Sequence, residues 1–300
     1  MDTPRRHAFR SMGTSVSLIA DPGSPAQAFE RAARTVEAVF AREDLRFSRF
    51  RGDSELTRVN AGAGRWTRVS PAFARLLAYS LEAAARSDGL FDPTVLPSLI
   101  AAGYDRDFDE LIAGARDALH PSEPCGRWSE VELDGDLVRL PAGVGLDFGG
   151  IAKGWAVDLA ARAAVDDGLR WAIVNAGGDL RIAGAPPRDG FEIAIDDPEA
   201  PGHELSRLRV ARGALATSSV TARAWGPGLH HLIDPRTGLP ADTGILQATV
   251  WARTCAEAEI LAKRALLSGS SILDRVSSVL VTGDGRVLTN LDLATSEVPA

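Results

Sequence analysis

The sequence predicts an α+β fold: one domain over residues 1–300, with helices packed on a mixed, mostly antiparallel sheet. Two turn signals, Asp134-Gly135 and Gly283-Asp284-Gly285, indicate β-hairpins, which join antiparallel strands. Apolar residues recur at helical spacing in segments that do not alternate regularly with strands, which disfavours a parallel α/β sheet. The sequence shows no internal repeat and no low-complexity linker, and its 300 residues suffice for a large core.

The first half of the chain contains one expected strand and two long helices. Residues 7–20 alternate polar and apolar, which predicts a strand. Ser24-Pro25 supplies an N-cap and a first-turn proline for a helix that runs to about residue 44. Ser70-Pro71 begins a second helix in the same way, and it ends before Asp88-Gly89.

The second half begins with a hairpin expected over 131–146 and a helix that opens within 146–155. Thr254 and Glu257 have capping-box spacing and predict the start of a third long helix. The last expected hairpin turns at 283–285. Further strands are expected at 171–174, 191–196, 207–215 and 246–252. Residues 103–127 and 185–204 are interpreted as loop-like insertions.

Composition excludes some classes of partner. The formal net charge is −7 and no basic stripe is present, which argues against nucleic acid and anionic membranes as partners. Only Lys153 and Lys263 are lysines among 33 basic residues, and both lie in motifs. No apolar run approaches the roughly 20 residues of a membrane span. Residues 1–10 lack an apolar signal region, so a cytoplasmic protein is expected.

Two cysteines, Cys125 and Cys255, lie far apart in the sequence without metal-binding spacing. They predict two free thiols in a reducing compartment, with a disulfide as the alternative.

Three polar runs are candidates for chemistry. His230 to Pro240 contains two imidazoles, a carboxylate, a guanidinium and a turn signal, although such a run can equally be a plain loop. Residues 146–155 place glycine-flanked backbone N–H groups and Lys153 at a helix start, which suits an anion; the alternative is a glycine-kinked turn with a surface lysine. The turn at 175–179 either contacts a ligand or is closed by Asp179 binding its own backbone.

Seven segments, taken in order, resemble the ApbE-type flavin transferases, which move FMN from FAD onto a threonine or serine of a protein. These segments are 11–14, 47–56 with Asn60, 89–94, 146–154 with Asp158, 175–179, 216–218 and 231–238. The resemblance covers nearly the whole chain and implies an ApbE-like, T-fold-like arrangement. It also implies FAD as substrate and, as partner, an acceptor protein with a reactive Ser or Thr.

The resemblance implies roles for single residues. His231 would be the base at the reacting diphosphate, and Lys153 would stabilise charge there. Phe50 stands where the family usually has a tyrosine that stacks on the flavin. The residues expected to contact FAD are Met12, Phe50, Leu90, Phe91, Asp92, Asp147, Lys153 and His231.

The metal site implied by the resemblance is altered in this chain. The family binds Mg²⁺ through a backbone carbonyl, here that of Gly150, and through an Asp and a Thr four residues apart on a helix. This chain has Glu259 and Lys263 there, and a protonated lysine cannot ligate Mg²⁺. Either Glu259 and Lys263 form a surface ion pair, or the Lys263 ammonium occupies the place of the metal. Ser219 also departs from the family, which usually has glycine there.

The expected function is therefore transfer of FMN from FAD to a protein hydroxyl, with release of AMP. Two alternatives stay open: hydrolysis of FAD to FMN and AMP, and binding of FAD without catalysis by a protein with a degenerate metal site.

Overall fold

A computed structural model describes residues 3–112, 125–200, 202–291 and 293–294. The chain groups into two compact units. The first comprises Met1–Phe40, Lys153–Ala222 and Thr243–Ala300, and the second comprises Ala41–Ala152 and Arg223–Asp242. Helices α1 (Ala26–Phe47) and α6 (Ala152–Asp166) each run from one unit into the other. The α+β class is confirmed, and the expectation of one domain over residues 1–300 stays a prediction.

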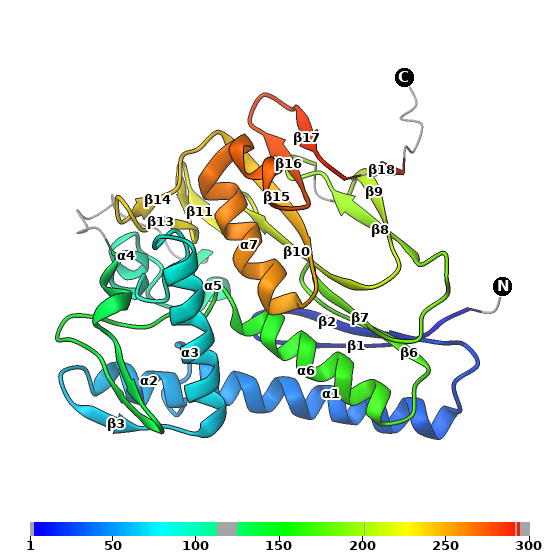
Figure 1. Ribbon diagram of the computed structural model, residues 1–300, viewed down its shortest axis with the longest axis horizontal. Coiled ribbons are helices and arrows are strands. Elements are labelled where there is room, and N and C mark those ends of the chain that lie inside the picture. The colour runs from blue at the N-terminus through cyan, green and yellow to red at the C-terminus, as the bar shows by residue number, and fades with distance from the viewer. Residues whose placement is uncertain (1–2, 113–124, 201, 292, 295–300) are drawn as a thin grey trace. The chain divides into compact units, whose positions relative to one another are not determined.

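The first unit is built on an eight-stranded sheet of order β1-β2-β6-β7-β10-β15-β16-β17 (Figure 1). Every neighbouring pair in it is antiparallel, which confirms the predicted sheet type. Its strands are β1 (Arg5–Ser11), β2 (Thr14–Ala20), β6 (Trp171–Ala176), β7 (Asp179–Gly184), β10 (Gly213–Ser219), β15 (Ile245–Ala252), β16 (Ser278–Thr282) and β17 (Val287–Thr289).

Both faces of this sheet are covered. Trp171 and Ile173 of β6 pack in a core shared with a small sheet of β8 (Phe191–Asp196), β9 (Glu204–Val210) and β18 (Leu293–Ala294). Ala172 and Val174 alternate with them and are fully buried, so the opposite face is covered too. Helix α7 (Cys255–Ser268) packs against β7, β10 and β15 and is followed by the 3₁₀ turn η2 (Gly269–Asp274).

Within its described residues, the second unit contains four helices and several short strands. Its core includes Phe47, Phe73 and Phe148, whose ring centroids lie 5.5–5.9 Å apart. The helices are α2 (Glu55–Ala61), α3 (Pro71–Arg86), α4 (Leu96–Ala101) and α5 (Phe108–Ile112), with the 3₁₀ turn η1 (Arg127–Glu130). The strands are β3 (Trp66–Arg68), β4 (Glu132–Asp134), β5 (Leu137–Arg139), β11 (Ala224–Gly226), β12 (Leu229–His230), β13 (Ile233–Asp234) and β14 (Leu239–Pro240).

Two of the predicted helix starts, at Ser70 and Thr254, are confirmed at the level of hydrogen bonds. Helix α1 does begin after Ser24-Pro25, but the Ser24 side-chain oxygen makes no hydrogen bond within the described residues, so the N-cap expected there is wrong. The Ser70 side chain accepts from the Phe73 N–H and a proline occupies the first turn of α3. The Thr254 side chain accepts from the Glu257 N–H at the start of α7. The hairpin predicted over 131–146 and the one at 283–285 are likewise present.

Three expectations are wrong. Residues 7–20 form a hairpin instead of one strand, with φ of +50° at Met12 and +68° at Gly13. Residues 207–215 contain the end of β9 and the start of β10, separated by Ala211 and Arg212; Gly213, the first residue of β10, has a φ of +97°. Residues 185–204 are not a continuous loop, because they contain β8, which is the strand expected at 191–196 and confirms that prediction. Of the loop predicted over 103–127, residues 113–124 lie outside the described residues.

Within the described part of the chain, no helix is long and apolar enough to cross a bilayer.

Candidate functional site

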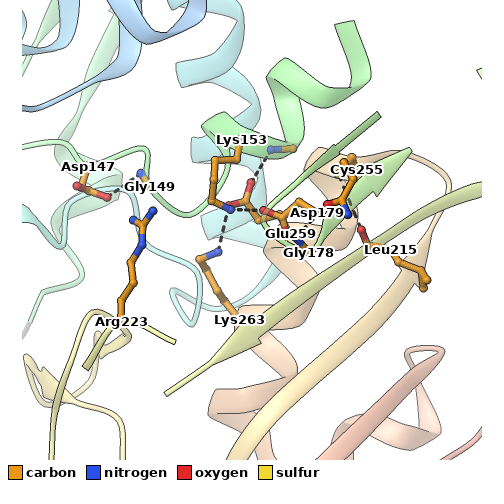
Figure 2. A network of polar contacts seen from close by, with 12 residues as sticks. Asp147, Gly149, Lys153, Gly178, Asp179, Leu215, Arg223, Cys255, Glu259 and Lys263 are labelled. Atoms are coloured by element: carbon orange, nitrogen blue, oxygen red, sulfur yellow. Dashed lines mark hydrogen bonds and ion pairs between the residues drawn. The ribbon is translucent and has the colours of Figure 1, made fainter. Parts of the chain in front are cut away.

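Two lysines and two acidic residues meet in the first unit; Lys153, Asp179, Glu259 and Lys263 are called here the lysine–carboxylate cluster (Figure 2). Lys153 Nζ lies 3.1 Å and Lys263 Nζ 3.4 Å from the same atom, Oε1 of Glu259. Lys153 also donates to Oδ2 of Asp179. The second oxygen of Glu259, Oε2, accepts from the Gly154 N–H at 2.9 Å.

Three elements bring these side chains together. Lys153 lies in the first turn of α6, and Glu259 and Lys263 are one turn apart on α7. Asp179 begins β7 directly after a turn through Gly177 and Gly178, both at positive φ. Asn175 Oδ1, not Asp179, accepts from the Gly178 N–H, so the expectation that Asp179 closes its own turn is wrong.

Close packing of α6 against the start of α7 holds the residues of the lysine–carboxylate cluster in place. A Cβ on Gly154 would lie 2.6 Å from the Cys255 carbonyl oxygen, so only glycine allows α6 to approach the start of α7 this closely. Asp158, one turn further along α6, accepts from the backbone N–H groups of Cys255 and Ala256 at 2.9 and 3.0 Å. These bonds satisfy N–H groups that a helix start leaves without intrahelical partners.

Burial and charge oppose one another within the cluster. Burial alone would raise the pKa of Glu259, but Lys153, Lys263 and the Gly154 N–H together lower it. Burial raises the pKa of Asp179 in spite of the nearby lysines. Burial also lowers the pKa of Lys263, against the attraction of Glu259. Glu259 is the carboxylate that the lysines hold charged.

The Glu259–Lys263 pair expected at i,i+4 is present, but it is not the surface ion pair considered above. The Glu259 and Asp179 side chains are each 1% exposed, whereas those of Lys153 and Lys263 are 19% and 17% exposed. Solvent therefore reaches the lysines and not the carboxylates. Such a surface favours an anionic ligand.

The cluster does not fit Mg²⁺. This ion takes oxygen ligands at roughly 2.0–2.1 Å in a near-octahedral shell, and an ammonium offers no lone pair. Both oxygens of Glu259 already accept from lysines or the Gly154 N–H. Among the described residues, no group of three or more His, Cys, Asp or Glu side chains is placed to hold a metal ion.

The second unit contains another charged group, here called the arginine–aromatic cluster: Arg49, Phe50, Tyr104, Asp147 and Arg223. Arg49 Nε lies 2.8 Å from Asp147 Oδ2, and both side chains are about nine-tenths buried. The guanidinium carbon lies 4.1 Å from the Phe50 ring centroid and 4.4 Å from that of Tyr104. Such contacts are favourable cation–π interactions.

The same cluster extends to a turn and to a second arginine. The other oxygen of Asp147, Oδ1, accepts from the Gly149 N–H at 2.7 Å, and Gly150 follows in the turn that precedes α6. Arg223 Nη1 donates to the Tyr104 hydroxyl at 3.4 Å, and its guanidinium points toward the Gly149 turn in Figure 2. Phe50 is 38% exposed, so its ring remains accessible to a ligand.

The two adjacent imidazoles have different environments. His230 is buried; its Nδ1 accepts from the Leu232 N–H, so Nε2 carries the proton and donates to the Ala241 carbonyl at 3.0 Å. Burial lowers the pKa of His230, which keeps it neutral. His231 is half-buried, and its backbone N–H donates to the Arg223 carbonyl. His230 is thus structural, which leaves His231 as the candidate base.

The remaining predicted site residues lie in turns. Met12 lies in the β1–β2 turn of the first unit, and Leu90, Phe91 and Asp92 follow α3 in the second. Phe91 and Asp92 are buried, and Asp92 accepts from the N–H groups of Thr94 and Gly126. Contact of these residues with FAD stays a prediction.

Sequence reasoning missed Asp179 as a lysine partner and Arg49 as the partner of Asp147. The signal for Asp179 was a carboxylate directly after a buried strand and a Gly-Gly turn. For Arg49 and Tyr104 the sequence contained no signal, because their partners are distant in the chain.

The antiparallel α+β fold thus holds a buried pair of carboxylates in contact with two partly exposed lysines. Residues 12–278 match the sequence model of the ApbE family. The chain belongs to this family. That membership confirms the resemblance inferred from the seven segments.

Comparison with individual proteins agrees with this family assignment. The "FAD:protein FMN transferase" of Rhodobacter capsulatus is 30% identical over 255 residues, covering 80% of this chain and 48% of that protein. The chain therefore spans about half the length of this relative. The protein of the same name from Treponema pallidum is 28% identical, covering 82% of this chain and 73% of that protein.

Solved structures show the same fold. The ApbE protein of Thermotoga maritima superposes with a TM-score of 0.82 at 24% identity, covering 96% of this chain and 97% of that one. The apo flavinyl transferase ApbE of Pseudomonas stutzeri gives a TM-score of 0.76 at 22% identity, covering 96% and 95%.

Proposed function

We propose that this chain is an FAD:protein FMN transferase. The observation that carries the proposal is family membership over residues 12–278, together with relatives named for this activity. The lysine–carboxylate cluster supports it, because two accessible lysines suit the charge of a dinucleotide diphosphate.

In the proposed reaction, a Ser or Thr hydroxyl oxygen of an acceptor protein attacks the FMN-side phosphorus of FAD. A new phosphoester bond forms to FMN, and the bond from that phosphorus to the bridging oxygen breaks. The bridging oxygen leaves with AMP, and His231 takes the hydroxyl proton. Lys153 stabilises the charge that develops on the diphosphate.

The proposal also assigns the binding of FAD. Phe50, held against Arg49, stacks on the flavin, and Asp147 binds the ribityl or ribose hydroxyls near the diphosphate. Met12, Leu90, Phe91 and Asp92 complete the proposed contacts. No step is assigned to Mg²⁺, and the carbonyl of Gly150 as a metal ligand stays a prediction, as does a cytoplasmic location.

The test is to incubate the purified chain with FAD and a soluble extract of the cells that encode it. Transfer predicts flavin fluorescence that remains on a denatured protein band, with an equal amount of AMP released. Free FMN together with AMP would show hydrolysis instead. FAD that stays bound without any AMP would show a binding protein and would overturn the proposed catalysis.

A further inference from the structure

We propose that Lys263 and Lys153 together supply the positive charge at the FAD diphosphate, so that this chain acts without a bound divalent cation. The inference rests on the proposed function and concerns the same reaction. It assigns to Lys263 a role as a catalytic residue that contacts the phosphates.

The distribution of basic residues is the first observation. Of 33 basic residues, two are lysines, and both ammonium groups lie within 3.4 Å of one oxygen of Glu259. A lysine is a compact point charge, whereas the planar guanidinium of arginine needs more room. In a chain that otherwise uses arginine, both compact cations thus occur at this one place.

The second observation is the direction from which a ligand can reach the cluster. The two carboxylates are almost fully buried, and the lysine side chains are the part exposed to solvent. Lys263 makes one hydrogen bond within the described residues, to Glu259 at 3.4 Å, although an ammonium has three donors. The remaining donors are available for the oxygens of a phosphate.

The third observation is that a metal would have to displace existing partners. Glu259 Oε2 is held by the Gly154 N–H, and Oε1 is shared by the two lysines. A divalent cation placed at Glu259 would be repelled by both ammonium groups at short range. The two lysines already neutralise the charge of the buried carboxylates, so the cluster needs no metal ion for that purpose.

The chain offers a direct spectroscopic test, because a protein labelled with ¹³C at the lysine Cε shows signals from two side chains only. In EDTA, FAD is expected to shift both signals, whereas MgCl₂ alone is expected to shift neither. Lys263→Met assigns the signals by removing one of them. A Mg²⁺-dependent shift of the Lys263 signal without FAD would overturn the inference.

Binding and turnover give the second readout. Lys263→Met is expected to weaken FAD binding in EDTA about tenfold, the loss of one charged hydrogen bond. Arg162→Met is the matched control, because it removes one cation from an α6 side chain that is 84% exposed, and it is expected to leave FAD binding unchanged. The double variant Glu259→Asp/Lys263→Thr restores oxygen ligands, so its AMP release is expected to rise with added Mg²⁺.

The outcomes separate the two proposals. If FAD shifts both lysine signals in EDTA but no AMP or protein-bound FMN ever forms, the transfer reaction fails and the lysine assignment stands. If the unmodified chain transfers FMN only when Mg²⁺ is added, the transfer reaction stands and the metal-independent role of Lys263 is wrong.

Discussion

Lys153 and Lys263 donate to the same oxygen of Glu259, at 3.1 and 3.4 Å, although they come from different helices. Their mutual repulsion is tolerated because both bind Glu259 and Lys153 also donates to Asp179. We therefore expect stability and the proposed binding of FAD to depend on the same buried carboxylate.

Glu259→Gln is expected to lower the free energy of unfolding by about 3 kcal/mol, because it leaves two mostly buried lysine side chains facing a neutral amide. The double variant Glu259→Gln/Lys263→Met should lose less, since one of the opposing charges is gone. Urea denaturation of both variants measures the difference. Glu37→Gln, at a half-exposed side chain paired with His7, is the control and should change stability by less than about 0.5 kcal/mol. Equal losses in the single and double variants would show that the lysines do not repel one another.

Arg49→Met is expected to cost about 3 kcal/mol of stability, because it leaves the buried carboxylate of Asp147 without its cation. It should also weaken FAD binding, since the Phe50 ring loses the guanidinium that packs on it. Arg49→Met/Asp147→Asn should recover part of the stability but not the binding. Urea denaturation and flavin fluorescence titration test the two effects separately. Full recovery of FAD binding in the double variant would contradict the role given to Arg49 in holding Phe50.

Gly154→Ala is expected to destabilise the protein by about 2 kcal/mol, although alanine favours helices. The new Cβ would lie under 3.0 Å from backbone atoms of Cys255 and Ala256, which cannot move without shifting α7. Gly52→Ala is the matched control, because its Cβ would meet nothing within 4 Å and its φ is not positive. Thermal unfolding compares the two variants. An unchanged midpoint for Gly154→Ala would mean that α6 and α7 are not in close contact in solution.

Burial raises the pKa of the Cys125 thiol to about 11, in spite of its hydrogen bond with Ser98. At pH 8 its thiolate fraction is then about 100-fold below that of a cysteine of ordinary pKa, so alkylation by iodoacetamide should be slower by a similar factor. Between pH 9 and 11 the native thiol keeps a proton that the unfolded thiol releases. The free energy of unfolding should therefore fall as pH rises through this window, and fall less steeply in Cys125→Ala. Alkylation at pH 8 as fast as that of a short cysteine peptide would contradict the burial of this thiol.

Sequence patterns correctly predicted those helix starts that depend on contacts between residues close together in the chain. The caps at Ser70 and Thr254 and the helices that they begin depend on neighbouring residues, and both were predicted from sequence. The Met12-Gly13 turn was missed, because methionine at positive φ is not a typical turn residue. The two-residue break before Gly213 was missed, because an isolated glycine inside a strand pattern also fits a continuous strand with a bulge.

In the candidate site, too, a contact between residues close in sequence was predicted and contacts between distant residues were not. The i,i+4 spacing of Glu259 and Lys263 predicted their ion pair, but its burial depends on how α7 packs on the sheet. Asp179 and Lys153 are 26 residues apart, and Lys153 and Glu259 are 106 apart, so no local pattern could pair them. The family motifs placed Lys153 and Glu259 in the candidate site without indicating that they bind one another.

In the proposed reaction, the FMN-side phosphorus of FAD ends on a protein hydroxyl. This step can be followed with FAD that carries a radioactive label on that phosphorus, incubated with the chain and a soluble extract of its own cells. We expect the label to become acid-precipitable with protein, in step with the release of unlabelled AMP. Label that stays in solution as free FMN, or that remains in intact FAD, would contradict the proposed reaction.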